Sequence, residues 1–193
     1  MNSDAAKPSG PLEKSLRAAV EVFERRGVSY ALMGGLALAQ HGVVRATQDV
    51  DLLLTVSQIQ LGTVLDDLRS AGFVFDLRET IREWQQDHMT QLEYRGIRVD
   101  WLAPVLPAFQ HVLMTAVRCQ MAGTTVRVAS ADGLVLLKLI AFREQDKVDA
   151  KGLLGANAGR LDLDTVREKL RDLFEEDDPR WRWLDRAVSD LAP

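Results

Sequence analysis

The stretch ALMGGLALAQHGVVRATQDVDLLL, residues 31–54, contains the signals that decide the fold. A short apolar run leads into Gly34-Gly35, and an apolar, helix-like stretch follows the pair and stops at Gly42. The next apolar run begins with Asp49 and Asp51. Because side chains alternate between the two faces of a strand, these two carboxylates are expected on one face. The pattern predicts a strand, a glycine turn, a helix and a second strand.

Two aspartates on one face of a strand need an explanation, because like charges repel and Asp is disfavoured in strands. A solvated strand end would explain Asp49 and Asp51 without any function. A divalent-metal site explains them together with Gly34-Gly35, since a glycine turn lets the backbone approach a polyphosphate. We therefore favour a metal site beside a phosphate-binding turn.

A third carboxylate is expected beside this pair. Two strand-like runs, Met89–Tyr94 and Ile97–Ala103, are joined at Arg95-Gly96, which predicts a hairpin. Asp100 lies on the second run and shares a face with Arg98. Hard oxygen ligands of this kind suit Mg²⁺. Taken singly, Asp100 could cap a turn and Asp49 could pair with Arg45, but neither alternative explains the aspartate pair.

Lys138 is the one charged residue in the run GLVLLKLIAF, residues 133–142, which predicts a buried helix capped by Ser130. A buried ammonium group needs a partner or a wet cleft. Its side chain could reach the surface, as most lysines do, or point at a nucleotide phosphate. The residues alone leave both alternatives open. The mixed charges of residues 143–151 predict a solvated helix face with pairing at i, i+3.

Size and composition are those of a soluble globular protein. The chain has 193 residues, of which 47% are hydrophobic and 27% charged, enough for one domain with a full core. A formal net charge of −4 argues against non-specific coating of nucleic acid. The single cysteine, Cys119, fits a reducing compartment. Without a signal-peptide pattern or an apolar run of ~18 residues, we expect a cytoplasmic protein with no membrane span.

The chain is expected to form a single compact unit in three parts. Residues 1–10 predict a disordered lead, residues 11–129 a core, and residues 130–193 a helical C-terminal part packed on that core. Several finer expectations concern short segments: residues 78–87 as a short helix or a loop over the cleft, a helix from Pro107 to about Val117, and an outlying hairpin of Cys119–Met121 with Val126–Val128.

These motifs together resemble those of the nucleotidyltransferase superfamily, which includes DNA polymerase β and the antibiotic nucleotidyltransferases. The superfamily pattern is Gly-Gly or Gly-Ser opening a helix, an Asp-x-Asp strand, and an acidic residue on a neighbouring strand. Here these are Gly34-Gly35, Asp49-Val50-Asp51 and Asp100. The second glycine departs from the common Gly-Ser form.

A finer resemblance extends over two distant segments. The segment from Arg45 to Leu52, followed downstream by Lys138 and by Arg143-Glu-Gln-Asp146-Lys-Val-Asp149, is similar to the AbiEii-type branch. Members of that branch are often toxins of toxin–antitoxin or phage-abortive systems. The resemblance therefore implies a cognate antitoxin as a partner of this chain.

The resemblance implies an α+β nucleotidyltransferase fold, with a mixed, mostly antiparallel sheet packed on helices. The implied reaction moves a nucleoside monophosphate from an NTP to an acceptor hydroxyl and releases pyrophosphate. Asp49, Asp51 and Asp100 would hold two Mg²⁺ or Mn²⁺ ions, and Asp100 would also help to deprotonate the acceptor. The remaining residues implied in nucleotide binding are Gly34, Gly35, Arg45, Thr47, Lys138, Asp146 and Asp149, with Lys138 counted as catalytic too.

The acceptor stays open among a tRNA end, a protein hydroxyl and a small molecule, and so does the base of the NTP. An alternative reading keeps the same fold but not the turnover. It makes the chain a catalytically silent module that binds nucleotide or another protein.

Overall fold

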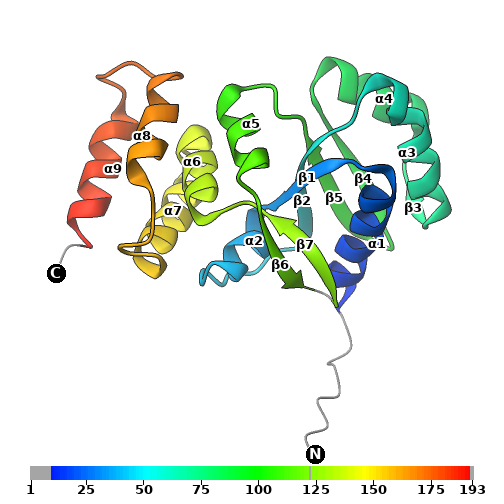
Figure 1. Cartoon of the computed structure of the whole chain (residues 1–193), viewed down its shortest axis with the longest axis horizontal. Helices are drawn as coiled ribbons and strands as arrows, with labels where there is room; N and C mark the ends of the chain where they lie inside the picture. The colour runs from blue at the N-terminus through cyan, green and yellow to red at the C-terminus, as the bar shows by residue number, and fades with distance from the viewer. Residues whose placement is uncertain (1–9, 122, 192–193) are drawn as a thin grey trace, which may run out of the picture.

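The computed structural model describes residues 10–121 and 123–191, in which helices and strands alternate along most of the chain (Figure 1). In chain order the elements are α1 (Pro11–Arg26), β1 (Ser29–Met33), α2 (Gly34–Gln40), β2 (Asp49–Thr55), α3 (Gln58–Ser70), β3 (Phe73–Val74), α4 (Leu77–Gln86), β4 (Met89–Tyr94), β5 (Ile97–Leu102), α5 (Pro107–Met114), β6 (Val117–Met121), β7 (Thr124–Val128), α6 (Ala131–Ala141), α7 (Glu144–Ala156), α8 (Leu163–Arg171) and α9 (Pro179–Ser189). Of the lead expected over residues 1–10, only Gly10 is described, and it is the N-cap of α1.

Within the described residues, the strands form one seven-stranded sheet in the order β3-β4-β5-β2-β1-β7-β6. The pairs β1–β7 and β2–β5 are parallel, and the other four pairs are antiparallel. The mixed, mostly antiparallel sheet implied by the resemblance is therefore confirmed. The strands β2 and β5 are direct neighbours, which brings together the two segments that carry the predicted carboxylates.

The hairpin expected at Arg95-Gly96 is confirmed and sets the register of β5. Both residues have positive φ, 52° and 81°, as the two central residues of a type I′ turn require. Arg95 is the residue of this turn that is not glycine, and its guanidinium lies 5.3 Å from the ring centroid of Tyr94. This cation–π contact holds its side chain against the strand. The β4–β5 pairing then continues to Met89 and Leu102.

One face of the sheet is buried under α1. In β2 the residues between the aspartates and after them, Val50 and Leu52, have no exposed surface. Trp101 of β5 packs edge-on against Phe23 of α1, with ring centroids 5.6 Å apart, and against Trp84 of α4 at 5.7 Å. The apolar side chains therefore anchor this face, and alternation leaves the carboxylates on the other.

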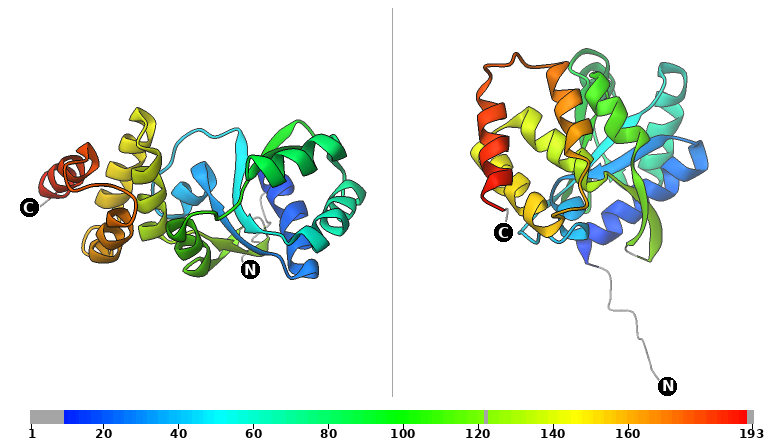
Figure 2. Two further views of the ribbon diagram at one scale, coloured as in Figure 1. Left: turned by 90° about the horizontal axis from the view of Figure 1, so that it is seen from above. Right: turned by 60° about the vertical axis from the view of Figure 1, so that its left-hand side comes forward.

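The helices of the C-terminal part gather at one end of the molecule. Figure 1 shows α6–α9 at the end opposite to α3 and α4, and the two views of Figure 2 show the same division. Within this part, Arg180 holds α9 to the end of α6, because its Nε donates to the carbonyl of Leu139 (2.8 Å) and its guanidinium stacks on Phe142 and Phe174. The helical character expected for residues 130–193 is therefore confirmed for the described part of that segment.

Three local expectations need correction. The hairpin of β6 and β7 is not outlying, because β7 pairs with β1 and extends the main sheet. The helix begun at Pro107 ends at Met114, and Val117 belongs to β6. The charged run 143–151 is not a solvated face throughout: Asp146 and Asp149 are each 1% exposed, because both form ion pairs with a lysine that lies inside the fold.

For residues 78–87 the sequence left a helix or a loop open; residues 78–86 lie in α4, and Asp87 is the C-cap of that helix. The side chain of Asp76 caps this helix by accepting a hydrogen bond from the Glu79 amide. No helix in the described part of the chain is both long and apolar enough to cross a membrane.

Candidate active site

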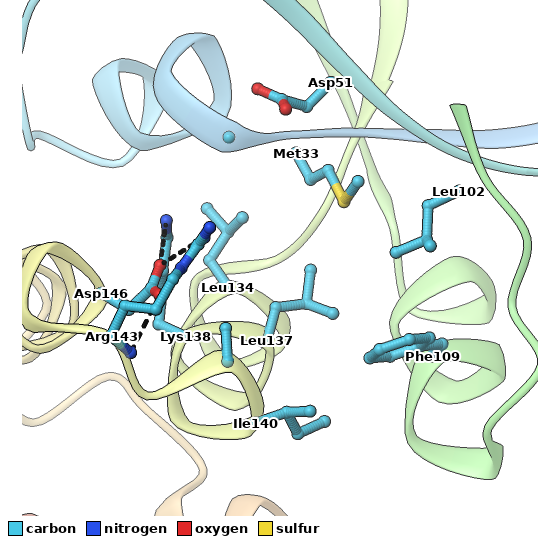
Figure 3. A pocket seen from close by; sticks show the side chains of 12 residues that line it. Met33, Asp51, Leu102, Phe109, Leu134, Leu137, Lys138, Ile140, Arg143 and Asp146 are labelled. Atoms are coloured by element: carbon cyan, nitrogen blue, oxygen red, sulfur yellow. Dashed lines mark hydrogen bonds and ion pairs between the residues drawn. The ribbon is translucent and has the colours of Figure 1, made fainter. Parts of the chain in front are cut away.

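A pocket of about 290 Å³ lies between the first turn of α2 and helix α6 (Figure 3). We call it the lysine pocket. Its polar end carries Lys138, Arg143 and Asp146, and Figure 3 shows Leu102 and Phe109 at the opposite side. The residues that line it are Met33, Gly34, Asp51, Leu102, Phe109, Leu134, Leu137, Lys138, Ile140, Ala141, Arg143 and Asp146.

The glycine pair brings bare backbone against the acidic strand. Gly34 has φ of 67°, and a Cβ at this position would overlap the Asp51 carboxylate. A Cβ on Gly35 would lie 2.5 Å from Cβ of Thr47 and 2.7 Å from its Oγ1. Each glycine is therefore required by one neighbouring side chain. The space that the usual serine of a Gly-Ser turn would take is filled here by Thr47.

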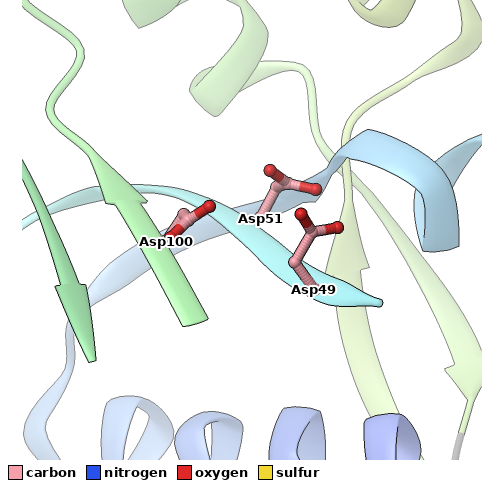
Figure 4. Close-up of side chains that lie close together, drawn as sticks. All are labelled: Asp49, Asp51 and Asp100. Carbon is pink, nitrogen blue, oxygen red and sulfur yellow. The ribbon is translucent and has the colours of Figure 1, made fainter. Parts of the chain in front are cut away.

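The three predicted carboxylates meet at one place. The parallel register sets Asp51 opposite Asp100 and Asp49 opposite Arg98. One carboxylate oxygen from each of Asp49, Asp51 and Asp100 lies within 4.8 Å of the others. Figure 4 shows the three side chains on the same side of β2 and β5. We call these residues the acidic triad.

The members of the triad differ in their electrostatic environment. Burial raises the pKa of Asp51 to about 6, and the charges of Asp49 and Asp100 add to this effect. The pKa of Asp100 is also raised, chiefly by burial. Burial acts on Asp49 too, but hydrogen bonds from Thr47 and Arg98 outweigh it and lower the pKa. Asp51 is thus the carboxylate that lacks stabilisation in the protein alone.

The hydrogen bonds of the triad explain this difference. Thr47 Oγ1 donates to Asp49 Oδ1 (2.8 Å), and Arg98 Nη2 donates to Asp49 Oδ2 (2.5 Å). Arg98 Nε also lies 3.2 Å from Asp100 Oδ2. Over residues 10–121 and 123–191, Asp51 accepts no hydrogen bond and forms no ion pair.

The donor set fits a divalent cation. Three carboxylates at this spacing offer the hard oxygen ligands that Mg²⁺ and Mn²⁺ prefer, and no described residue donates to the oxygens of Asp51. The raised pKa of Asp51 is consistent with such a site. Burial and like charge disfavour the charged carboxylate, and a bound cation would offset both effects. We therefore take Asp49, Asp51 and Asp100 as the residues able to hold the metal.

Lys138 does not reach the surface, and it does not point freely into the pocket either. Its side chain is 12% exposed, and Nζ lies 2.9 Å from both Asp146 Oδ1 and Asp149 Oδ2. Arg143 Nε donates to Asp146 Oδ2 (2.6 Å), and Arg45 Nε lies 3.3 Å from Asp149 Oδ1. We call these five residues the buried charge network.

This network places several predicted site residues. Asp146 and Asp149, expected to bind nucleotide, direct their carboxylates at Lys138, and Asp146 also lines the lysine pocket. Arg45 pairs with Asp149 and not with Asp49, so the alternative that Asp49 simply pairs with Arg45 is wrong. Thr47 lies at the triad itself, as the donor to Asp49.

A second pocket, distinct from the lysine pocket, is lined by Asp51 and Asp100 of the triad. It measures about 470 Å³ and includes the carboxylates of Asp51, Glu83, Asp87 and Asp100, while no described lysine or arginine lines it. We call it the acidic pocket. The sequence did not single out Glu83 or Asp87; the one available signal was the polar stretch 78–87, taken as a possible cover of the cleft. Asp51 lines both pockets and so stands at their junction.

Comparison with known proteins rests on structure. No protein-family model matches this chain, and no curated protein matches it. Among solved structures, ANT(2″)-Ia in complex with adenylyl-2″-tobramycin has a TM-score of 0.55 and 12% identity, over 90% of this chain and 97% of that chain. The lincomycin-bound lincosamide antibiotic adenylyltransferase LnuA has a TM-score of 0.50 and 17% identity, over 75% of this chain and 97% of that chain.

A solution structure of the antibiotic-resistance factor ANT(2″)-Ia gives a similar result, with a TM-score of 0.55 and 13% identity. It covers 92% of this chain and 97% of that chain. At these identities the likeness shows the architecture. Together with the observed sheet, it shows that the chain has the nucleotidyltransferase fold.

Proposed function

We propose that this chain is a nucleotidyltransferase that moves a nucleoside monophosphate from an NTP to an acceptor hydroxyl and releases pyrophosphate. The observation that carries the proposal is the position of Asp51. It stands with Asp49 and Asp100 against the glycine turn, at the junction of a pocket with cations and a pocket with carboxylates. The fold shared with an adenylyltransferase supports this class of reaction.

The nucleotide is assigned to the lysine pocket. Gly34 lines this pocket, and because it has no side chain of its own, phosphate oxygens can approach its backbone. Gly35 is buried behind it against Thr47, and we propose that it allows the tight turn that presents Gly34. The ammonium of Lys138 and the guanidinium of Arg143, whose side chain is 77% exposed, supply the positive charge. The apolar side chains at the far end of the pocket are suited to the base.

The acidic triad supplies the reaction centre. Two bound Mg²⁺ or Mn²⁺ ions would stabilise the charge that develops on the phosphoryl oxygens. Asp100 faces the acidic pocket, from which the acceptor would approach, and its raised pKa suits a group that takes a proton from the acceptor hydroxyl. Asp49 is held in place by Thr47.

For Asp146 and Asp149 we propose a role other than the nucleotide binding implied by the resemblance. Both are buried, and the carboxylate of each forms an ion pair with the ammonium of Lys138. We propose that they hold Lys138 at the wall of the lysine pocket, where it meets the nucleotide. Arg45 then acts on Asp149 and reaches the triad only through its charge, which lowers the pKa of Asp51.

The reaction is tested with α-labelled ATP, GTP, CTP and UTP, each incubated with the protein, Mg²⁺ and a cell extract. We expect label to appear in one class of acceptor, namely tRNA, protein or a small molecule. The variant Asp49→Asn/Asp51→Asn should abolish labelling. The matched control Asp66→Asn/Asp164→Asn makes the same change at two exposed positions and should retain it.

Each other outcome has a definite meaning. Full activity in Asp49→Asn/Asp51→Asn would refute the assignment of the metal ligands. Binding of NTP and Mg²⁺ without label in any acceptor would favour the catalytically silent module. Absence of NTP binding would refute the proposed function altogether.

The AbiEii-type resemblance supports a narrower proposal, in which the chain is the cytoplasmic toxin of a toxin–antitoxin or phage-defence system and binds a cognate antitoxin. Its test is expression in cells. The wild-type chain should arrest growth and Asp49→Asn/Asp51→Asn should not. Normal growth with active, well-expressed wild-type protein would refute the toxin role while leaving the transferase proposal intact.

A further inference from the structure

Arg98 stands among the three carboxylates of the triad. The register of β2 and β5 makes a square of four side chains on one face: Asp49 and Asp51 on β2, Arg98 and Asp100 on β5. Three members of the square are negative and one is positive. The positive member contacts two of the other three, Asp49 at 2.5 Å and Asp100 at 3.2 Å.

These contacts use oxygens that a metal ion would need. Both oxygens of Asp49 are engaged, one by Thr47 and one by Arg98, and one oxygen of Asp100 is paired with the same guanidinium. Asp51 alone is free of donors among the described residues. An ion that binds Asp51 meets no competitor, whereas an ion that bridges Asp49 and Asp100 must displace Arg98.

Arg98 has the freedom to be displaced. Its side chain is 50% exposed, and it lines a third hollow together with Leu36, Thr47 and Asp49. A guanidinium on a long, half-exposed side chain can leave one partner for water without leaving a buried charge behind. Lys138 differs in this respect, because both of its carboxylate partners, Asp146 and Asp149, are buried.

We propose that Arg98 takes the place of one of the two metal ions in the nucleotide-free protein and determines how many ions the triad binds. Without nucleotide, the triad then binds one ion through Asp51, and Arg98 pairs with the other two carboxylates. The second ion is bound when the phosphates of the NTP add their own negative charge and Arg98 gives up Asp49 and Asp100. This inference rests on the proposed function, because it takes the triad as the metal site.

The test is a Mn²⁺ titration of the nucleotide-free protein, with free Mn²⁺ counted by electron paramagnetic resonance and heat measured by calorimetry. The wild type should bind one ion. Arg98→Gln should bind a second ion, or bind Mn²⁺ roughly tenfold more tightly, the change expected from loss of one competing charge-assisted hydrogen bond.

Arg143→Gln is the matched control. It also removes one positive charge that acts on Asp51, but its ion pair is with Asp146 and not with the triad. It should leave the number of bound ions unchanged and tighten binding by less than about threefold. Equal effects of the two variants on Mn²⁺ binding would mean that Arg98 acts only through its charge and does not compete for the ligand oxygens, and this would overturn the inference.

A melting experiment provides a second readout. Without metal, Arg98→Gln should melt at a lower temperature than the wild type, because three carboxylates then face each other unneutralised. Mn²⁺ should restore more stability to Arg98→Gln than to the wild type. Unchanged or weaker Mn²⁺ binding in a folded Arg98→Gln would overturn the inference. Mn²⁺ binding that survives in Asp49→Asn/Asp51→Asn would instead refute the metal site of the proposed function.

Discussion

The acidic triad and the buried charge network contain the same residue type in opposite electrostatic conditions. In the network, the two carboxylates of Asp146 and Asp149 are nearly inaccessible, yet the pKa of Asp146 is lowered, because hydrogen bonds from Arg143 and Lys138 outweigh burial. In the triad, burial and like charge raise the pKa of Asp51 to about 6. The difference is the supply of cations from within the chain.

The network has three cations for two carboxylates, whereas the triad has Arg98 for three. A group that the chain neutralises by itself contributes to the folded structure. A group left short of cations reduces stability until something from outside binds. The comparison therefore separates a structural use of aspartate from a functional one, and the predictions below test each side of it.

The largest effect is expected at Lys138, the centre of the network. Lys138→Met leaves two buried carboxylates without their shared partner, and it should lower the free energy of unfolding by about 4 kcal/mol. Urea unfolding monitored by circular dichroism measures this loss. Lys151→Met is the control, because the Lys151–Asp190 pair is about half exposed and should change stability by less than about 1 kcal/mol. A Lys138→Met protein as stable as the wild type would contradict the comparison.

Asp51 should show the opposite sign. Its pKa is raised from 3.8 to about 6 in the folded protein, so the folded state loses stability as pH rises from about 4, and the full loss is reached above about pH 6. In chelator at about pH 8, Asp51→Asn should therefore raise the free energy of unfolding by about 2 kcal/mol.

The pH dependence of this gain provides the check. At about pH 4 the Asp51 carboxyl is protonated in the folded protein, so the advantage of Asp51→Asn should disappear. Asp164→Asn, at an exposed position, should have no comparable effect at either pH. A stability gain of equal size at both pH values would mean that charge at Asp51 is not its origin.

A smaller effect on the free energy of unfolding is expected at the glycine turn, where Gly35 packs against Thr47. Gly35→Ser introduces a side chain where Thr47 already lies, and overpacking should reduce stability by about 1.5 kcal/mol. The double variant Gly35→Ser/Thr47→Gly should recover most of this loss. Gly62→Ser is the control, since a Cβ there meets nothing within 4 Å and helix propensity favours the serine. A Gly35→Ser protein as stable as Gly62→Ser would refute the steric coupling to Thr47.

The sequence predicted the two strands that carry the triad because their signals are local, whereas the placement of Asp100 beside the aspartate pair came from the resemblance. The i, i+2 spacing of Asp49 and Asp51 fixes their common face, and the Arg95-Gly96 turn fixes the hairpin that carries Asp100. The glycine pair was also found from its place between a strand and a helix. Each of these features depends on residues close in the chain, where backbone geometry limits the outcomes.

The environment of Lys138 could not be predicted, because its partners lie one helix further along and the packing of α6 on α7 decides which face of α7 is buried. Charge patterning indicated a solvated run there, and tertiary pairing overrode it. Arg98 was placed on the face of Asp100 but without a role, since only the neighbouring strand brings Asp49 into its reach. The acidic pocket needs α4 and β4 together, which no local pattern specifies.

The position of the bond that is broken in the NTP tests the proposed reaction most directly. Two parallel reactions, one with α-labelled and one with γ-labelled NTP, each contain Mg²⁺ and an unlabelled acceptor of the class found in the extract experiment. They distinguish transfer of the nucleoside monophosphate from transfer or hydrolysis of the γ-phosphate. A nucleotidyltransferase places the α label on the acceptor and releases the γ label as pyrophosphate, and Asp51→Asn loses both signals. Transfer of the γ label to the acceptor, or release of inorganic phosphate without transfer of the α label, would contradict the assignment of this chain as a nucleotidyltransferase.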